Sequence, residues 1–312
     1  MKLLDLLLAS GGKGPECPAF PGWLPVWTAL QERHADCSPF VAGIAAAMQA
    51  DRLAWAFFSG YQAAIRSAFP GALSAATVAA FCVQEPGRKI SEITTTLDEH
   101  GGGLLLQGHK GWLLAGPEDF VLFVLARRAG RSKGPGSLAV VSVPFQAEGI
   151  CRGPVRVQAM VPELAHAEVS FDAVSLPASR VLPGDGYADY AKPFRVREDI
   201  CVTGCALACL FAEGRAGEWP APWAQRCVAA IAGLESCSRL DPDDARTHIV
   251  TAGTLSFAGA VIRESEQHWR DDQIAARDRW QRDRSILDLG KEARRQRAIK
   301  SWLGMGRTAQ ET

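Results

Sequence analysis

Apolar residues recur at helical spacing in the first part of the chain. Between residues 39 and 69 they lie three to five residues apart, at Val41, Ile44, Met48, Leu53 and Phe57. This spacing predicts one long helix, which Pro70-Gly71 ends, and we expect a short second helix after it. Residues 11–26 are rich in Gly and Pro and are typical of an irregular leader. Residues 1–80 are therefore predicted to form an N-terminal helical domain.

The pattern changes after residue 80. Short apolar or alternating runs, separated by Gly-rich turns, cover residues 93–97, 103–107, 120–127, 137–144 and 167–171. They predict an antiparallel β-barrel or sandwich, which forms a middle β-domain over residues 81–188. Helical stretches then follow at 194–215, 222–238 and 243–304, the last broken near Asp271. They predict a C-terminal antiparallel helical bundle over residues 189–312. The predicted fold class is α+β, in the order helix, β, helix.

Composition narrows the possible partners and the compartment. Among 312 residues, 34 Lys and Arg balance 34 Asp and Glu, so net charge favours neither nucleic acid nor an anionic membrane. No apolar run reaches transmembrane length, and the apolar start, Met1 to Ser10, is too short for a signal peptide. Nine cysteines without a CxxC pair are typical of a reducing compartment. We expect a soluble cytoplasmic protein.

Three of these cysteines share one predicted helical face, because Cys201, Cys205 and Cys209 lie four residues apart. Three thiols in a row are able to bind copper or zinc, but no His or fourth ligand accompanies them. Gly204 and Ala208 complete a stripe of small residues instead. The stripe favours helix packing, and we predict no metal site.

Three local patterns follow one another in the middle of the chain. They are Phe81-Cys82-Val83-Gln84-Glu85-Pro86-Gly87, then Gly108 to Gly116 (GHKGWLLAG), and then Val169 to Pro177 (VSFDAVSLP). Their order and spacing resemble the middle β-domain of the flavin-dependent acyl-CoA dehydrogenases, and the predicted helix, β, helix order matches that family as well. The resemblance implies a divergent, shortened member that binds FAD and oxidises the α,β carbon–carbon bond of an acyl thioester.

The resemblance also implies which residues contact the flavin. Phe81, Cys82, Val83 and Gln84 correspond to the segment along the ring, with Gln84 in place of a hydroxyl residue; its amide can still donate to the ring. Ser91 is what remains of a Gly-Ser-Asp turn, in which Arg88 and Lys89 could face a phosphate. Trp112, Leu113 and Leu114 correspond to a second wall. Without the resemblance, these residues are a polar turn and a core tryptophan.

The reaction needs a carboxylate that removes the α-proton of the thioester. The family places it at the start of the first bundle helix or in the last long helix. The matching candidates here are Glu198 and, as the alternative, Glu292, each one residue from the expected position. We prefer Glu198, which lies between Arg197 and Asp199; the competing interpretation is a charge cluster that fixes the domain junction. Glu292 stands in a charged run typical of a solvated helix face.

The likeness is strongest over residues 81–190 and is only architectural elsewhere. The chain lacks the Arg-x-x-Phe-Gly and Gln-x-x-Gly-Gly-x-Gly elements that hold the adenosine and pyrophosphate of FAD in the family. Weak or lost flavin binding therefore stays open, together with two alternative functions: a catalytically degenerate binding or scaffold protein, and a flavin-dependent monooxygenase of the same superfamily. Partners implied by the resemblance are an acyl-CoA or acyl-carrier thioester, an electron-transfer flavoprotein, and further copies of the chain in a homodimer or homotetramer.

Overall fold

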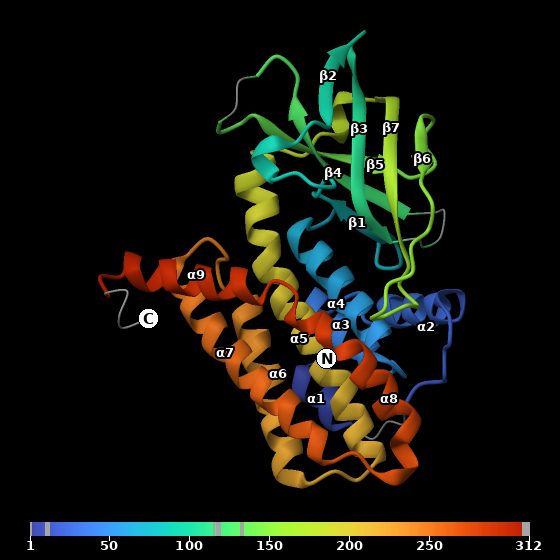
Figure 1. Cartoon of the computed structure of the whole chain (residues 1–312), viewed down its shortest axis with the longest axis vertical. Coiled ribbons are helices and arrows are strands. Elements are labelled where there is room, and N and C mark those ends of the chain that lie inside the picture. Colours follow the sequence, from blue (N-terminus) through green and yellow to red (C-terminus); the bar gives the residue numbers. More distant parts are fainter. Residues whose placement is uncertain (1, 10–12, 115, 117–119, 132–133, 308–312) are drawn as a thin grey trace. The chain divides into compact units, whose positions relative to one another are not determined.

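The computed structural model describes residues 2–9, 13–114, 116, 120–131 and 134–307 (Figure 1). Ser10 and, in the GHKGWLLAG pattern, Ala115 lie outside the described residues. The chain divides into two compact units. The helical unit comprises residues 1–76, 159–161 and 196–312, and the β-unit comprises residues 77–158 and 162–195. The domain boundaries expected after residues 80 and 188 remain predictions.

The helical unit begins with four helices, namely α1 (Leu3–Leu8), α2 (Phe20–Arg33), α3 (Pro39–Ala47) and α4 (Leu53–Ala68). The single helix predicted over 39–69 is wrong, because the chain turns between α3 and α4 where buried Asp51 and Arg52 form an ion pair of 2.6 Å. The irregular leader is also wrong from residue 20 onward. Trp23 and Trp27, four residues apart on α2, are fully buried and hold that segment in the core.

Five further helices follow within the described residues: α5 (Lys192–Ala216), α6 (Ala221–Ser238), α7 (Ala245–Glu264), α8 (Ile274–Asp283) and α9 (Lys291–Gly304). The predicted break near Asp271 is confirmed, and a second break at residues 284–290 separates α8 from α9. Helices α4 and α5 approach closely at Gly60, where an added Cβ would lie 2.6 Å from the Cα of Val202. None of the helices in the described residues has the length and apolar character needed to cross a membrane.

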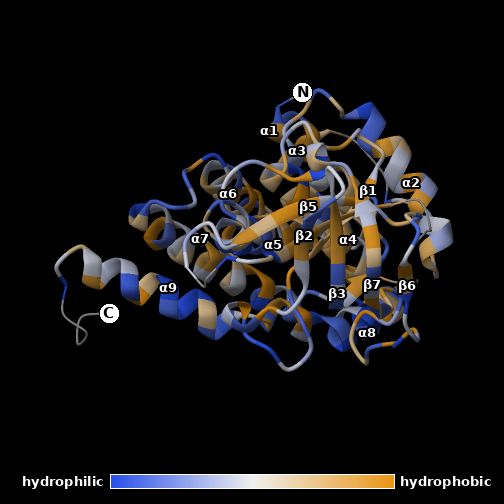
Figure 2. Cartoon of the chain, turned by 90° about the horizontal axis from the view of Figure 1, so that it is seen from above, coloured by the Kyte–Doolittle hydropathy of each residue, from blue (hydrophilic) through white to orange (hydrophobic). Residues whose placement is uncertain are grey.

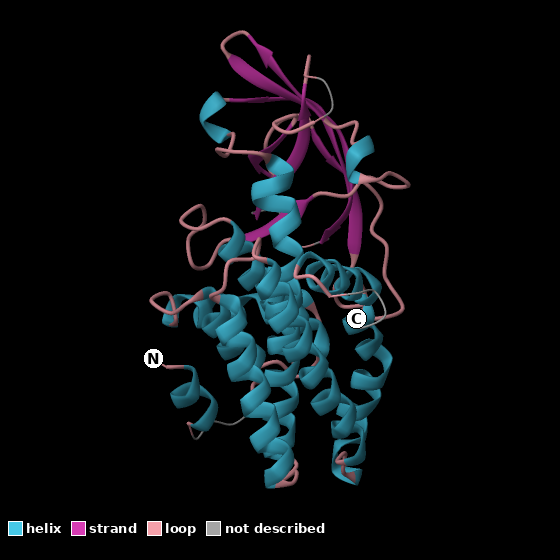
Figure 3. Ribbon diagram, turned by 90° about the vertical axis from the view of Figure 1, so that its left-hand side faces the viewer, coloured by secondary structure: helices cyan, strands magenta, loops and turns pink. Residues whose placement is uncertain are grey.

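The strands all belong to the β-unit (Figure 3). They are β1 (Val78–Cys82), β2 (Thr96–His100), β3 (Gly103–Leu114), β4 (Phe120–Arg128), β5 (Leu138–Pro144), β6 (Ile150–Arg152) and β7 (His166–Leu176). β1 occupies the place of the short helix predicted after Pro70-Gly71, so that prediction is wrong; the run Val78 to Cys82 is buried throughout and pairs with β4. The predicted order of helix, β and helix is confirmed.

The sheet has the strand order β1-β4-β2-β3-β7-β6, with β5 paired to β4. It is mixed rather than antiparallel throughout, because β1 and β2 run parallel to β4. The apolar period of a strand does not reveal the direction of its neighbour, which explains why the sequence did not predict these pairs. Strand β5 is orange over most of its length in Figure 2, and its Val140, Val141 and Val143 are buried.

Candidate functional site

A buried ion pair fixes the loop that follows β1. The side chains of Glu85 and Lys110 are both fully buried, and Lys110 Nζ lies 2.9 Å from Glu85 Oε1. Glu85 also accepts hydrogen bonds from the backbone N–H and the hydroxyl of both Thr94 and Thr95, at 2.6–2.9 Å. Lys110 Nζ donates a further bond to the Val83 carbonyl at 3.3 Å. The loop between β1 and β2 is therefore held from both ends.

These contacts govern the ionisation of Glu85. Burial alone raises the pKa of a carboxyl group, but the four hydrogen bonds from Thr94 and Thr95 and the charge of Lys110 outweigh it. The pKa of Glu85 consequently falls to about 2. Glu85 is therefore ionised near neutral pH and has no lone-pair capacity left for a substrate proton. Its role is to position the residues on either side of it.

A β-bulge presents Trp112 on the surface of the β-unit. The register between β3 and β7 shifts between Lys110 and Leu113, which leaves one extra residue on β3. Trp112 takes a left-handed backbone conformation there, with φ of 60°, and its side chain is 62% exposed. Such a conformation is an outlier for a bulky residue, and strain of this kind gathers at ligand sites. The ring of His166 meets the indole edge-on at 5.6 Å.

The bulge is tied to the loop after β1. The Gly111 N–H donates to the Gln84 carbonyl at 3.0 Å, so Trp112 follows directly on the point where the two segments meet. Pro86 packs against Gly111, and a Cβ at Gly111 would lie 3.4 Å from its ring. An exposed Gln84 and an exposed Trp112 are thereby held near each other. A planar ligand could stack on the indole and accept a hydrogen bond from the amide.

The other predicted flavin residues lie in several environments. Val83, Gln84 and Ser91 line one cavity. Phe81 is buried against Phe194, with ring centroids 5.1 Å apart, and Leu113 is fully buried. Burial raises the pKa of the Cys82 thiol to about 12, so this thiol stays protonated. Leu114 ends β3 and is half-buried. The side chains of Phe81, Cys82 and Leu113 thus belong to the interior, and their contact with a flavin stays a prediction.

The cavity lined by Gln84 lies wholly within the β-unit and has a volume of about 880 Å³. Three basic side chains, Arg88, Lys89 and Arg195, line it, and none of them forms an ion pair within the part of the chain that the structure describes. Arg127 also lines it and donates to the carbonyls of Ile93 and Ser91. We call this space the cationic cavity.

Two carboxylates line the cationic cavity, and both are already engaged. Glu85 is paired with Lys110, while Asp185 caps the following helical turn by accepting from the backbone N–H groups of Tyr187 and Ala188 at 2.7–2.8 Å. Burial raises the pKa of Asp185, but these backbone bonds outweigh burial and the pKa is lowered. The three basic side chains therefore create a net positive field in the cavity, which suits an anionic ligand.

The two candidate bases both belong to the helical unit. Glu198 is half-buried and is the seventh residue of α5. It therefore lies beyond the first turn of the helix, and the helix dipole acts most strongly within that first turn. Glu292 lies in the first turn of α9 with its side chain 69% exposed, 2.7 Å from Gln296 and 3.5 Å from Arg295. These bonds lower the pKa of Glu292. Glu292 has the solvated position that its charged surroundings predict, so Glu198 remains the better candidate.

The neighbour of Glu198 has a role that the sequence did not indicate. Asp199 accepts from Arg294 at 2.9 Å and also bonds Arg297, so it ties α5 to α9. Burial raises the pKa of Asp199 even though both arginines oppose the rise. Nothing in the spacing could have paired residues almost a hundred positions apart. Because both of its oxygens are engaged, Asp199 is a structural residue rather than a free base.

The cysteine stripe of α5 packs against α3 and its following turn. Cys201, Cys205 and Cys209 are buried, Cys209 donates to the Ala50 carbonyl at 3.6 Å, and a Cβ on Gly43 would lie 3.3 Å from Cys205 Sγ. Burial raises the pKa of each of the three thiols. Neutral, close-packed thiols are typical of a helix interface. Across the described residues, no group of His, Cys, Asp or Glu is arranged to bind a metal ion.

We compared the sequence and the structure of the chain with those of known proteins. No protein-family model matches the chain. The solved structure of butyryl-CoA dehydrogenase from Megasphaera elsdenii superposes with a TM-score of 0.63, covering 94% of this chain and 91% of that one at 14% identity. The chain has the acyl-CoA dehydrogenase fold. A glutaryl-CoA dehydrogenase from Mycobacterium smegmatis in complex with FADH2 shares this fold, with a TM-score of 0.61, 13% identity, and coverage of 91% and 89%.

One relative is also similar in sequence. Benzylmalonyl-CoA dehydrogenase of Aromatoleum aromaticum is 33% identical over 160 residues, which are 48% of this chain and 41% of that protein. The aligned part therefore spans less than half of the relative's length. The exposed indole of Trp112 and the Gln84 amide near it are groups that could hold a flat heteroaromatic ring such as that of a flavin. The sequence offers no matching elements for the adenosine half.

Proposed function

We propose that the chain is an FAD-dependent oxidoreductase that oxidises the α,β carbon–carbon bond of an acyl thioester. One observation carries the proposal: Gln84 lines the cationic cavity and also bonds Gly111, next to the exposed Trp112. A surface for a flat ring thus adjoins a cavity for an anion. A flavin together with a thioester on a phosphate-bearing carrier requires this combination.

Each group has a role in this proposal. Bound FAD would supply the acceptor for a hydride from the β-carbon. Trp112 would support the ring and the Gln84 amide would donate to its polar edge. Arg88, Lys89 and Arg195 would attract the phosphates of the carrier, because charge-assisted bonds are about twice as strong as neutral ones. Glu198 would remove the α-proton.

The names of similar proteins support the finer parts of the proposal. A relative named benzylmalonyl-CoA dehydrogenase and a similar structure bound to FADH2 are consistent with a coenzyme A thioester and a flavin. An acyl-carrier thioester is the alternative substrate. An electron-transfer flavoprotein is proposed as electron acceptor, and a homodimer or homotetramer as the assembly.

The visible spectrum of the protein, recorded after incubation with FAD and desalting, tests the cofactor. We expect retained flavin absorbance in the wild type and in Trp112→Phe, which keeps an aromatic face, and its loss in Trp112→Gly. Glycine accepts the left-handed backbone without strain and Trp112 buries little surface, so Trp112→Gly should change the unfolding free energy by no more than about 1 kcal/mol. Equal flavin retention in Trp112→Gly and wild type would place the ring elsewhere.

Titration with butyryl-CoA tests whether the cationic cavity binds the phosphates of the carrier. Reversing the charge in Arg88→Glu should weaken binding by roughly tenfold or more, since a bond to a charged group contributes about 1.5–3 kcal/mol. Arg180→Glu, which changes an exposed arginine of the same unit outside the cavity, is the matched control. The difference in butyryl-CoA affinity between the wild type and Arg88→Glu should become smaller at high salt, because salt screens the charges. The same dissociation constant for both variants contradicts a phosphate site at Arg88.

A second function is favoured by the missing adenosine elements. In this alternative the chain keeps the fold as a binding or scaffold protein and has lost FAD. The loss of charge-assisted bonds worth about 1.5–3 kcal/mol each supports it. A protein that stays colourless after incubation with FAD but still binds butyryl-CoA through Arg88 would decide for this function. Oxygen consumption that depends on reduced flavin would instead identify a monooxygenase.

A further inference from the structure

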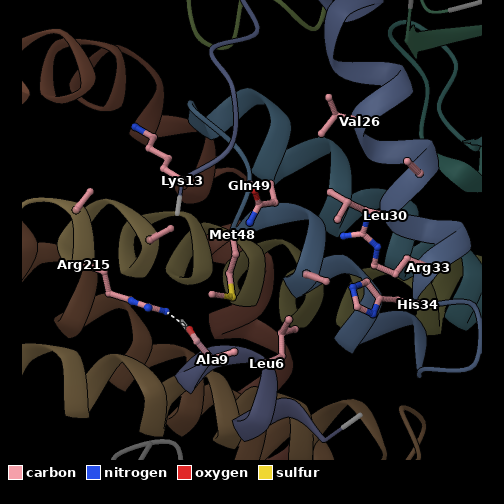
Figure 4. Close-up of a pocket in the computed structure, with 14 residues that line it drawn as sticks. Leu6, Ala9, Lys13, Val26, Leu30, Arg33, His34, Met48, Gln49 and Arg215 are labelled. Atoms are coloured by element: carbon pink, nitrogen blue, oxygen red, sulfur yellow. Dashed lines mark hydrogen bonds between the residues drawn. The ribbon is translucent and has the colours of Figure 1, made fainter. Parts of the chain in front are cut away.

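A second cavity, within the helical unit, has no role in the proposed function. Its volume is about 530 Å³, within the range of roughly 300–1,000 Å³ that is typical of small-molecule sites. Its walls come from α1, α2, the end of α3 and the last turns of α5. In Figure 4, Arg33 and His34 lie at one end, Lys13 and Arg215 lie at the other, and Met48 is between them.

The walls are aliphatic. On α2, Val26 and Leu30 line the cavity and are half-buried; they lie on the same side of the helix as Trp23 and Trp27, which are fully buried in the core. Val26 and Leu30 are thus an apolar stripe of α2, at the edge of its buried face, that packing within the unit covers only in part. The remaining apolar lining comes from other elements, at Leu6, Ala45, Met48 and Ala212. No Phe, Tyr or Trp is part of the described lining, so the space suits a flexible chain better than a planar ring.

The charged groups at the cavity are basic, and no Asp or Glu lines it among the described residues. Lys13 is paired with Glu213, and Arg215 donates to the carbonyls of Leu7 and Ala9 at 3.3 and 2.8 Å. Arg33, at the end of the α2 stripe, has no hydrogen-bond or ion-pair partner for its side chain within the described residues. An exposed guanidinium that has no protein partner in the described residues thus stands at the end of an aliphatic wall.

We propose that this cavity binds a medium-chain fatty acid, with its chain along Val26, Leu30 and Met48 and its carboxylate at Arg33. The planar guanidinium matches a carboxylate in two parallel bonds. His34 lies beside it and is half-buried; burial first, and then the charge of Arg33, lower its pKa. His34 is therefore neutral near pH 7 and offers one N–H to the same carboxylate.

Calorimetric titration of the protein with decanoate tests the proposal. We expect one saturable site, and in Arg33→Gln a dissociation constant about tenfold higher, because a charge-assisted bond is lost. Arg263→Gln is the matched control, since Arg263 is an exposed arginine of α7 outside the cavity. Octanoate should bind about tenfold more weakly than decanoate, because each buried methylene contributes about 0.8 kcal/mol.

Two further variants sharpen the result. Val26→Trp, which fills the cavity from α2, should abolish decanoate binding without removing a charge. Arg88→Glu, at the cationic cavity of the β-unit, should leave decanoate binding unchanged, so this proposal and the proposed function fail separately. The proposal is overturned if decanoate does not saturate, if Arg33→Gln and Arg263→Gln bind it equally, or if octanoate and decanoate have the same affinity.

Discussion

Replacing Lys110 by Met should lower the unfolding free energy by about 3–5 kcal/mol. The change leaves Glu85 ionised and fully buried without the charge that faces it at 2.9 Å. Glu85→Gln should have a comparable effect, because it leaves the Lys110 ammonium unpaired. Urea denaturation of both variants, followed by circular dichroism, gives the two values.

The double variant Glu85→Gln/Lys110→Met distinguishes two causes of the lost stability, namely an unpaired buried charge and a general disruption of the core. Once both charges are removed, the cost of burying an unpaired ion disappears, and most of the lost stability should return. A double variant that is as unstable as the sum of the two single variants would show that the two side chains act independently, so that an unpaired buried charge is not the cause of the lost stability.

The Glu85–Lys110 pair also makes the stability of the fold depend on pH in the acid range. The folded pKa of Glu85, about 2, lies below the ordinary value of 4.5, so its stabilising contribution is present above pH 4.5 and is lost as the pH falls towards 2. Glu85→Gln should lack this part of the acid dependence. The unfolding free energy of the wild type and of Glu85→Gln, measured over the same acid pH range, gives the slope of stability against pH for each protein. The difference between the two slopes does not depend on their absolute stabilities.

Changing Glu198 to Gln should abolish reduction of bound flavin by an acyl-CoA while the flavin stays bound. Gln keeps the size and shape of Glu but cannot accept the α-proton, and a positioned general base contributes about 10²–10⁴-fold to rate. Anaerobic mixing with butyryl-CoA, monitored by flavin bleaching, measures the effect. The matched control is Glu292→Gln, at the exposed alternative position on α9.

Which of the two variants loses flavin reduction identifies the catalytic base. Reduction lost only in Glu292→Gln would transfer the role to that residue. Unchanged reduction in both variants would remove both candidates, and flavin displaced from Glu198→Gln would point to a structural function for the residue.

Periodicity predicted the broad fold because it reports which side of an element is buried. The predicted strands at 120–127 and 137–144 agree with β4 and β5 within about one residue. Helix α2 was missed because Pro21 and Pro25 lie within it, while the spacing of Trp23 and Trp27 was the signal that could have revealed it. Strand β1 was missed because its alanines resemble the helical segment before it.

The candidate site was less predictable because it depends on two details of the backbone. The bulge before Leu113 turns Trp112 outward, whereas in a regular strand Trp112 would share the face of the buried Lys110. The single extra residue of the bulge leaves no mark on the sequence. The cationic cavity gathers Arg88, Arg127 and Arg195 from separate segments. Only Arg88 and Lys89 were noticed, because they stand next to a recognisable motif.

The Glu85–Lys110 pair also limits how this sequence can change over time. Either residue alone can mutate only through an intermediate that loses a large share of a typical stability of about 5–15 kcal/mol. A lineage that loses its activity is therefore held at these two positions by the requirement to fold. Both residues belong to the patterns on which the family resemblance rests. Their presence in a related chain accordingly reports a shared fold, and activity has to be judged at Gln84, Trp112 and Glu198 instead.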